Sequence, residues 1–453
     1  MIVIGVVDAE TAFFDHETGI DWNVIFLLFG MMVIVGVLKQ TGLFEFLALW
    51  AARKSGGHPY RLLVLLVLVG ATVAPILDNV TCVLLVAPVT LSVCRRLGLP
   101  PAPYLISLIL ASNIGGTATL IGDPPNIIIG SRAGLIFVDF LVRSLPLTVV
   151  LLAGFVLLAR WLFRYQLSPP VEVHGRLGDI HPRDAITTMR LLVRCLVVLT
   201  VVMVAFGLHT VLHLDPSMVA MVGAGATVLV SRTSPEEFLE EVERGTLAFF
   251  MALFVLVGSL VKVGVIGEVR RMATQTMGDR ELLGATALLF GSAVIGAFVD
   301  NIPYTTAMVP IVQDMVAATP SSGAESPLWW AFVFGADLGG NTTAVAAGAN
   351  VVVLGIAAKA GGADQLLGTH QVRRCRDRGL ARRRLALRLR PLLRSGLTTP
   401  TPHSARGGIG DDTADPRALS SSICRLTSSM RQFAAKTHHG VRLTSTIRAR
   451  QSG

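Results

Sequence analysis

The stretch Ala111–Ser131 constrains the fold more than any other part of the chain. Apolar residues flank it on both sides, and it contains the pairs Gly115–Gly116 and Pro124–Pro125. Adjacent glycines and prolines do not fit inside a regular helix, so we expect the helix to break here. In a bilayer, broken backbone is tolerated only where protein buries it or where it lines a watery cavity. Interrupted helices of this kind form binding sites in membranes, although a polar loop between two spans is the alternative.

The composition indicates an integral membrane protein. Of the 453 residues 52% are hydrophobic and 15% are charged, with a mean hydropathy of +0.63. Soluble proteins carry about 25% charged residues, and here apolar runs near the ~20 residues of a membrane span recur. A soluble enzyme is therefore excluded. Met1–Val7 is too short for a cleavable signal peptide, and the five scattered cysteines predict neither a disulfide framework nor a metal site. We expect no cofactor.

The glycine-rich stretch has a counterpart in the second half of the chain. A shift of 222 residues places Asp78 and Asn79 on Asp300 and Asn301. A shift of 224 residues aligns four further pairs: Gly115 with Gly339, Gly116 with Gly340, Thr119 with Thr343, and Asn126 with Asn350. Such internal repetition is typical of transporters built from two structural repeats.

Each repeat has a two-limbed apolar element with a polar tip before its broken helix. In residues 62–94 we expect limbs of roughly 15 residues, about 22 Å long and shorter than a ~30 Å hydrocarbon core. Arg61 and the pair Arg95–Arg96 flank this element, which places both ends in the cytoplasm. We therefore predict a re-entrant hairpin, with two short full spans as the alternative. The flanks of residues 282–316, Asp279–Glu281 and Ser321–Ser322, have no net basic bias, so this element is expected to enter from the other side.

The predicted fold is an all-α integral membrane protein, an inverted-repeat secondary transporter with two re-entrant hairpins and two broken helices. We expect the first repeat in residues 1–164, a cytoplasmic linker in 165–188 and the second repeat in 189–360. We expect the first repeat to be shortened at its amino end, because two spans in 191–231 have no counterpart before residue 8. The span predicted at 135–162 has no counterpart near 359–386.

The last segment, residues 361–453, holds 18 of the 39 basic residues and only 5 of the 30 acidic ones. No membrane helix tolerates that density of arginine. Our hypothesis is that the reading frame shifts near Gly361 and that the last span is lost. Translating the gene in all frames would test it. A genuine disordered polybasic tail on an anionic leaflet is the alternative.

Four carboxylates lie in apolar or small-residue segments. Asp78, Asp300 and Asp337 are candidates for binding ions or protons, because an intramembrane carboxylate costs several kcal/mol unless it is solvated, paired or protonated. Asp123 has the same candidacy, but it precedes Pro124 and is equally suited to cap the resumed helix. These four residues are the predicted charged part of the site.

Neutral polar residues and glycines occur at the same level. Their alternative role is to satisfy backbone groups at the helix breaks. The candidates are Asn79, Thr81, Asn113, Thr117, Thr119, Asn126, Asn301, Asn341, Thr342 and Asn350, with Gly115 and Gly116 allowing backbone groups to approach a ligand. Lys39 and Lys262 are expected to snorkel. Cys82 is either a soft ligand for trivalent arsenic or a buried core residue.

These motifs resemble a known family. Gly115–Asn126, Leu77–Thr81 and Asp300–Pro303 are similar to the arsenite permease and P-protein branch of the ion transporter superfamily, over about residues 5–360. The resemblance implies a multi-pass inner-membrane transporter whose hairpins and broken helices surround one site and move like an elevator. It also implies that relatives include arsenite and antimonite exporters, sodium–proton antiporters, and dicarboxylate or citrate carriers.

The hairpin tips favour one substrate class. The resemblance implies a Ser-Asn-Thr triplet at each tip in dicarboxylate carriers, whereas this chain has Asp78 and Asp300 there, where an anion would be repelled. We predict proton-coupled export of arsenite or antimonite, with protons carried by Asp78 or Asp300. The alternatives are a sodium–proton antiporter, a dicarboxylate- or citrate-type carrier, or a non-functional remnant.

The expected partners are a small inorganic solute, protons, the lipid bilayer and a second copy in a homodimer, but no nucleic acid. The chain has no phosphate-binding loop of the Gly-x4-Gly-Lys-Ser/Thr type. We therefore do not expect an enzyme, and any coupling to ATP would require a separate ATPase subunit.

Overall fold

The computed structural model of the chain is helical throughout the residues that it describes. These are residues 7–15, 18–164, 166–167, 181–232, 240–268, 271, 281–319, 321, 325–343 and 346–359. The chain divides into two units, Met1–Asp377 and Arg378–Gly453, and the helices below all belong to the first. The Arg-rich tail with its hypothetical frameshift, most of the predicted linker and most of the acidic piece at 235–243 lie outside the described residues.

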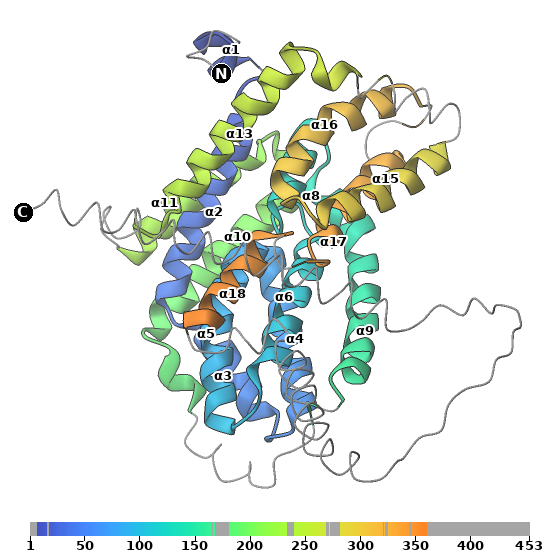
Figure 1. Ribbon diagram of the computed structural model, residues 1–453. Coiled ribbons are helices and arrows are strands. Elements are labelled where there is room, and N and C mark those ends of the chain that lie inside the picture. The colour runs from blue at the N-terminus through green and yellow to red at the C-terminus, as the bar shows by residue number, and fades with distance from the viewer. Residues whose placement is uncertain are drawn as a thin grey trace, which may run out of the picture. The chain divides into compact units, whose positions relative to one another are not determined.

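The first repeat contains both predicted features, a hairpin and a broken helix (Figure 1). Its elements are α1 (Ala9–Phe14), α2 (Trp22–Gln40), α3 (Leu43–Lys54), α4 (Pro59–Leu77), α5 (Asn79–Leu97), α6 (Pro101–Gly116), α7 (Pro124–Ala133), α8 (Phe137–Asp139), the π-helical turn η1 (Phe140–Ser144) and α9 (Leu145–Leu162). The helix break falls between α6 and α7, where the glycine and proline pairs predicted it.

The second repeat has the same order. Its elements are the 3₁₀ turn η2 (Pro182–Ala185), α10 (Met189–Leu212), α11 (Pro216–Ser231), α13 (Arg244–Lys262), α15 (Glu281–Gly296), α16 (Asn301–Ala317), α17 (Pro327–Gly339) and α18 (Gly348–Lys359). The second hairpin is α15–α16, and the second break separates α17 from α18. Of the described helices, six are long and apolar enough to cross a membrane.

The limbs of the first hairpin are longer than the sequence predicted. Helices α4 and α5 have 19 residues each, which corresponds to about 28 Å and is long enough to cross a bilayer. The length argument was therefore wrong, because α4 already begins at Pro59 and Arg95–Arg96 lie in the last turn of α5. The hairpin follows instead from its tip, because Asn79 is buried against the broken helix and bonds to Asn113.

Each hairpin packs its first limb against the helix before the break, α4 on α6 and α15 on α17. The contact is close because a glycine lies in it. A Cβ added to Gly115 would lie 2.6 Å from the carbonyl oxygen of Ala71, and one added to Gly339 would lie 3.2 Å from the Cα of Ala293. These pairs are equivalent in the two repeats. Backbone-to-backbone packing of this kind joins a hairpin and its broken helix into one unit.

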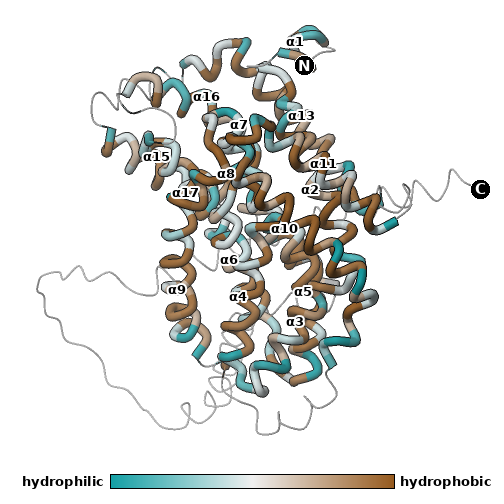
Figure 2. Tube along the Cα trace, turned by 180° about the vertical axis from the view of Figure 1, so that it is seen from behind, coloured by the Kyte–Doolittle hydropathy of each residue, from teal (hydrophilic) through white to brown (hydrophobic). Residues whose placement is uncertain are grey.

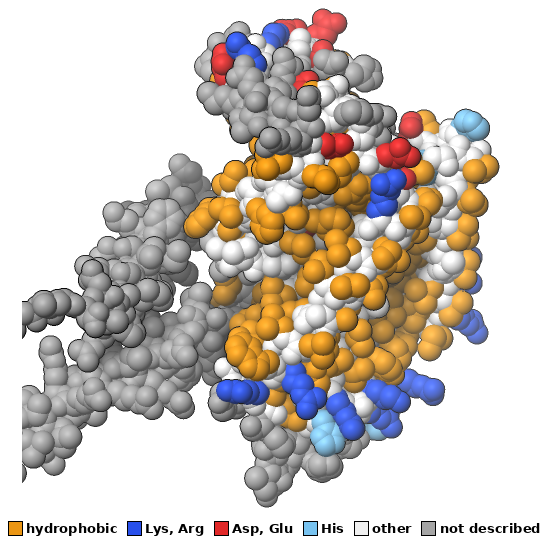
Figure 3. All heavy atoms as spheres, turned by 90° about the vertical axis from the view of Figure 1, so that its right-hand side faces the viewer, with side chains coloured by type: hydrophobic (Ala, Val, Ile, Leu, Met, Phe, Trp, Pro, Cys, Tyr) orange, Lys and Arg blue, Asp and Glu red, His pale blue; other side chains and the backbone are white. Residues whose placement is uncertain are grey.

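The outer surface of the helical part of the chain is apolar, as a bilayer requires. Leu229 on α11 is 80% exposed and Val222 is 73% exposed. Hydrophobic residues run along α9 and α10 (Figure 2), and one broad face carries mainly hydrophobic side chains (Figure 3). Water would not tolerate an exposed patch of this size, so lipid is the expected solvent.

Charged side chains mark the two ends of this apolar face. Lysine and arginine gather at one end, whereas most acidic side chains lie toward the other (Figure 3). Among the described basic residues, Arg53 and Lys54 lie in the last turn of α3, and Arg95 and Arg96 lie in the last turn of α5. The positive-inside rule assigns this end to the cytoplasm, so the first hairpin begins and ends there.

The two lysines near the ends of α2 and α13 form ion pairs across the repeats. Lys39 Nζ lies 2.7 Å from Glu241 Oε2, and Lys262 Nζ lies 3.2 Å from Asp8 Oδ1. Glu241 lies just before α13 of the second repeat, and Asp8 is the N-cap of α1 of the first. These contacts give each lysine an acidic partner, and exposed ion pairs of this kind contribute at most about 1 kcal/mol. The expectation that the two side chains snorkel stays a prediction.

Candidate functional site

The carboxylates at the two hairpin tips cap helices. Asp78 Oδ1 accepts a 2.7 Å hydrogen bond from the Thr81 backbone N–H, and Oδ2 accepts one of 2.7 Å from the Thr81 hydroxyl. Asp300 Oδ1 accepts from the Ile302 backbone N–H at 3.1 Å. Both acids therefore begin the second limb of their hairpin as N-caps. Their predicted role as proton carriers stays a prediction.

Asp123 does not cap the resumed helix. It precedes α7 but makes no side-chain cap bond there, so the capping alternative is wrong. Instead, Oδ2 accepts a 2.6 Å bond from Asn79 Nδ2 and Oδ1 accepts a 3.5 Å bond from Asn301 Nδ2. The side chain is 1% exposed. One buried carboxylate thus contacts the tips of both hairpins.

The equivalent residues Asn126 and Asn350 stabilise the two helix breaks in the same way. Asn126 Nδ2 donates to the carbonyl oxygens of Gly116 (3.3 Å) and Thr119 (3.0 Å). Asn350 Nδ2 donates to the carbonyl oxygens of Gly340 and Thr343, both at 2.7 Å. These bonds satisfy carbonyls that the break leaves without helical partners. They also fix the amide orientation, so that each Oδ1 is available to another donor.

Asn113 joins the two repeats. Its Oδ1 accepts a 3.2 Å bond from Asn79 Nδ2. Its Nδ2 donates to Asn341 Oδ1 at 2.9 Å and to Asn350 Oδ1 at 3.5 Å. The structure thus brings these four amides together and shows which of their atoms meet, while their predicted role in binding stays a prediction.

The predicted threonines and glycines lie in less central positions. The Thr119 hydroxyl donates to the Pro75 carbonyl at 2.6 Å, and the Thr117 hydroxyl donates to the Asn113 carbonyl at 3.1 Å. Thr342 is exposed. A Cβ on Gly116 would lie 2.6 Å from the Gly122 carbonyl oxygen. Backbone, as at Gly115, fills the space where a ligand was expected to approach.

We call the polar residues at the two hairpin tips and the two helix breaks the polar centre. Within it, Asp337 on α17 is the described carboxylate that lacks hydrogen-bond partners. It is 1% exposed, and neither carboxylate oxygen has a hydrogen-bond partner among the described residues. The side chains of Thr117 and Asn126 lie beside it without forming a well-aligned bond. Within the same part of the chain, Asn79 Oδ1 and Asn126 Oδ1 are also buried without a partner. All four of these atoms are hydrogen-bond acceptors.

The two buried carboxylates occupy non-equivalent positions of the repeats. At the shift of 224 residues Asp123 falls on Ala347, and Asp337 falls on Asn113. The sequence analysis compared only positions at which the two repeats carry the same residue, so it overlooked this asymmetry. A carboxylate in one repeat opposite an alanine in the other was the signal that could have singled out Asp123 as more than a helix cap.

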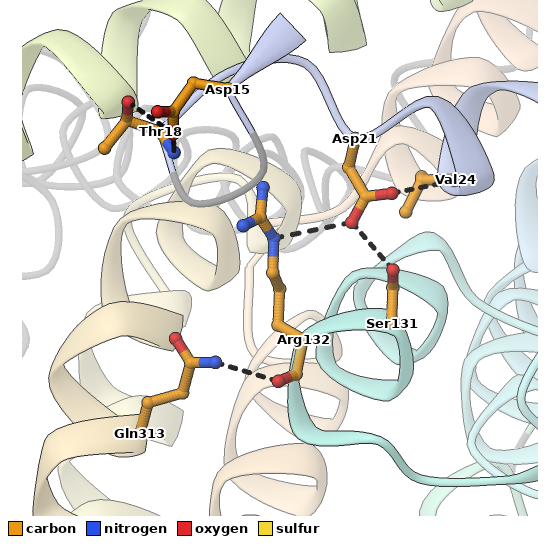
Figure 4. Close-up of polar contacts among 7 residues, drawn as sticks. All are labelled: Asp15, Thr18, Asp21, Val24, Ser131, Arg132 and Gln313. Atoms are coloured by element: carbon orange, nitrogen blue, oxygen red, sulfur yellow. Dashed lines mark hydrogen bonds and ion pairs between the residues drawn. The ribbon is translucent and has the colours of Figure 1, made fainter.

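A polar cluster that the sequence analysis did not predict lies at the beginning of α2 (Figure 4). Asp21 Oδ2 accepts a 2.7 Å bond from the Ser131 hydroxyl and lies 3.4 Å from Arg132 Nε. Gln313 Nε2 of α16 donates to the Arg132 carbonyl at 2.8 Å. The cluster connects α2 to the end of α7 and to the second hairpin.

Two further features lie near the first hairpin tip. A cavity of about 60 Å³ beside Asp78 is lined by Lys39, Glu241 and Glu243, and it has room for water. Cys82 is fully buried, with its thiol 3.6 Å from the Gly70 carbonyl oxygen. This burial and this contact agree with the interpretation of Cys82 as a core residue.

Inverted repeats with two hairpins and two broken helices, meeting at a buried polar centre, define a multi-pass secondary membrane transporter. The chain belongs to the citrate transporter family (CitMHS), whose sequence profile matches residues 1–335. It is a transporter and not an enzyme.

Similar proteins agree with this assignment. An uncharacterized transporter of Mycobacterium tuberculosis is 49% identical over 361 residues, which cover 80% of this chain and 84% of the relative. A 46 kDa membrane protein of Mycobacterium leprae is 48% identical over the same shares. The P protein of Homo sapiens is 32% identical over 76% of this chain and 50% of its own length. The resemblance to the ion transporter superfamily and its P protein is thus confirmed, whereas the family profile names citrate transporters and not arsenite permeases.

Proposed function

We propose that this chain exports arsenite or antimonite in exchange for protons. One observation carries the proposal. The unpartnered asparagine and aspartate atoms of the centre, in Asn79, Asn126 and Asp337, are all acceptors. A neutral trihydroxide of arsenic or antimony offers three O–H donors and so matches these acceptors. Buried polar groups of this kind cost about 1–3 kcal/mol each when they stay unpaired, which favours such a solute.

The charge of the centre also supports a neutral solute. Asp78, Asp300 and Asp337 are the carboxylates whose charges act on Asp123. Within the described part of the chain, the hydrogen-bond partners of Asp78, Asp123 and Asp300 are amides, a hydroxyl and backbone N–H groups, and Asp337 has none. An anion 4 Å from one uncompensated carboxylate would be repelled by about 4 kcal/mol at an effective dielectric constant of 20.

The same carboxylate supports exchange with protons. A dry carboxylate without donors needs a proton or the hydroxyls of a solute to offset its burial. When Asp337 is ionised, it accepts hydroxyl donors from the solute. When the solute leaves, a proton takes its place. Because the two occupants exclude each other, protons that enter down their gradient drive the solute out.

A second candidate is a citrate-type anion carrier, which the description of the family favours. A sodium–proton antiporter would use the same acceptor oxygens for a cation. The homodimer and the separate ATPase subunit stay predictions.

Flux in proteoliposomes without ATP tests the proposal. The purified protein is reconstituted with an imposed pH gradient, and arsenite, antimonite, citrate or sodium is added while a pH-sensitive dye reports proton movement. We expect arsenite-dependent proton flux that Asp337→Asn abolishes and that Glu45→Gln, a change of an exposed carboxylate on α3, leaves intact. Proton flux with citrate or sodium but not with arsenite would overturn the proposal.

A further inference from the structure

Asp123 is the described side chain that bonds to the tips of both hairpins, through Asn79 at 2.6 Å and Asn301 at 3.5 Å. These asparagines are equivalent residues of the two repeats. The hairpins that carry them begin at opposite ends of the molecule, so the tips meet head to head at this carboxylate. The second repeat has no equivalent carboxylate, because Ala347 occupies the position that matches Asp123.

We propose that Asp123 is a positioning residue that holds the tips of the two hairpins together through hydrogen bonds to Asn79 and Asn301. The proposal rests on the transport function above, but it assigns Asp123 a task different from that of Asp337. Asp337 binds the solute or proton, whereas Asp123 keeps both oxygens engaged by amides of the protein.

The two tips are not held equally. The first has two further bonds, because Asn79 Nδ2 also donates to Asn113 at 3.2 Å and the Asn79 carbonyl accepts from the Ser112 hydroxyl at 2.9 Å. The second tip has the long bond to Asp123 and a 3.3 Å bond from the Asn301 backbone N–H to the Ala346 carbonyl. The Thr343 hydroxyl also donates to the Ala297 carbonyl at 2.5 Å, as the equivalent Thr119 does to Pro75 in the first hairpin. Loss of the Asp123 carboxylate should therefore loosen the second tip around Asn301 more than it loosens the first tip.

The test exchanges the hydrogen-bond donor and acceptor between positions 123 and 301. Asp123→Asn retains one acceptor for Asn79 but turns an amide nitrogen toward the donor of Asn301. The double variant Asp123→Asn/Asn301→Asp lets the new amide donate to a carboxylate on the hairpin, so the tie is restored in reverse. Asp123→Asn/Asn341→Asp is the matched control, because it keeps the same total charge but restores no bond between positions 123 and 301.

Hydrogen exchange of the full-length protein in nanodiscs is the first measurement. Loss of the hydrogen bond from Asn301 to the Asp123 carboxylate should speed exchange at the tip of the second hairpin by about tenfold. We expect this in Asp123→Asn and in the control, with unchanged exchange at the first tip and recovery in the reversed pair. Unchanged exchange in Asp123→Asn would overturn the proposal, as would failure of the reversed pair to recover.

Proton leak in vesicles without solute is the second measurement, because a merely structural residue would lower all flux and not create a leak. We expect a leak in Asp123→Asn that the reversed pair suppresses. If Asp123→Asn does not fold, Asn301→Ala removes the same contact from the other side, and normal exchange in it would equally overturn the tie. The exchange result needs no substrate, so it stands or fails separately from arsenite transport.

Discussion

Replacing Asp337 by asparagine should stabilise the protein while it abolishes transport. The carboxylate is 1% exposed and has no hydrogen-bond partner within the described residues. An aspartate at the centre of a membrane helix costs about 2.5–3.5 kcal/mol on insertion scales. The amide of Asp337→Asn carries no charge, and its N–H groups can donate to the unpartnered Asn126 Oδ1, a gain of about 1 kcal/mol. Because a proton already offsets the charge of Asp337 when no solute is bound, the expected net stabilisation is that of the new hydrogen bond, about 1 kcal/mol.

The assay is thermal unfolding in nanodiscs at neutral pH, read alongside proton flux in vesicles. Asn113→Asp is the control, because it places a carboxylate at the equivalent position of the first repeat and loses the donors to Asn341 and Asn350. It should lower the melting temperature. An unchanged or lowered melting temperature in Asp337→Asn would refute the reasoning, since Asp337 would then be compensated in the folded protein.

Three further predictions test the packing and the ion pairs. Gly115→Ala should cost about 1–3 kcal/mol through overpacking and Gly339→Ala less, because their added Cβ atoms meet backbone at 2.6 Å and 3.2 Å; equal melting temperatures would contradict this. Asp21→Ala should cost more than Lys39→Met, because the Asp21 side chain is 10% exposed and Lys39 is 44% exposed; the reverse order in thermal unfolding would be inconsistent with the ion-pair geometry. Bonds from Thr11 hold the pKa of Asp8 at about 2, below its usual 3.8, so its stabilising effect is complete above about pH 4 and is lost as the pH falls through 2. The difference in melting temperature between wild type and Asp8→Asn should stay constant across neutral pH, and a change there would argue against the ionised Asp8.

Much of the architecture was predictable from the sequence. Glycine and proline pairs break a helix wherever they occur, so the break between α6 and α7 followed from Gly115–Gly116 and Pro124–Pro125 alone. Equivalent residues at fixed shifts predicted the second hairpin and the second break. The apolar composition predicted a membrane protein, because helix periodicity and hydropathy are local properties of the chain.

Other features needed long-range contacts. The sequence could not show that Asp123 bridges Asn79 and Asn301, because the three residues come from two hairpins and a helix break. It singled out Asp78 as a candidate for binding an ion or a proton and did not predict that this residue caps α5, which the bonds to Thr81 show.

What the sequence by itself determined is therefore the kind of fold, the two repeats and the set of polar residues at the centre. What only the tertiary structure decided is which of these residues bond to one another and which stay unpaired. The physical reason is that a carboxylate's role depends on its donors. Asp123 receives two amides from distant hairpins, whereas Asp337 receives none from the described residues, although both read in the sequence as lone acids in apolar helices.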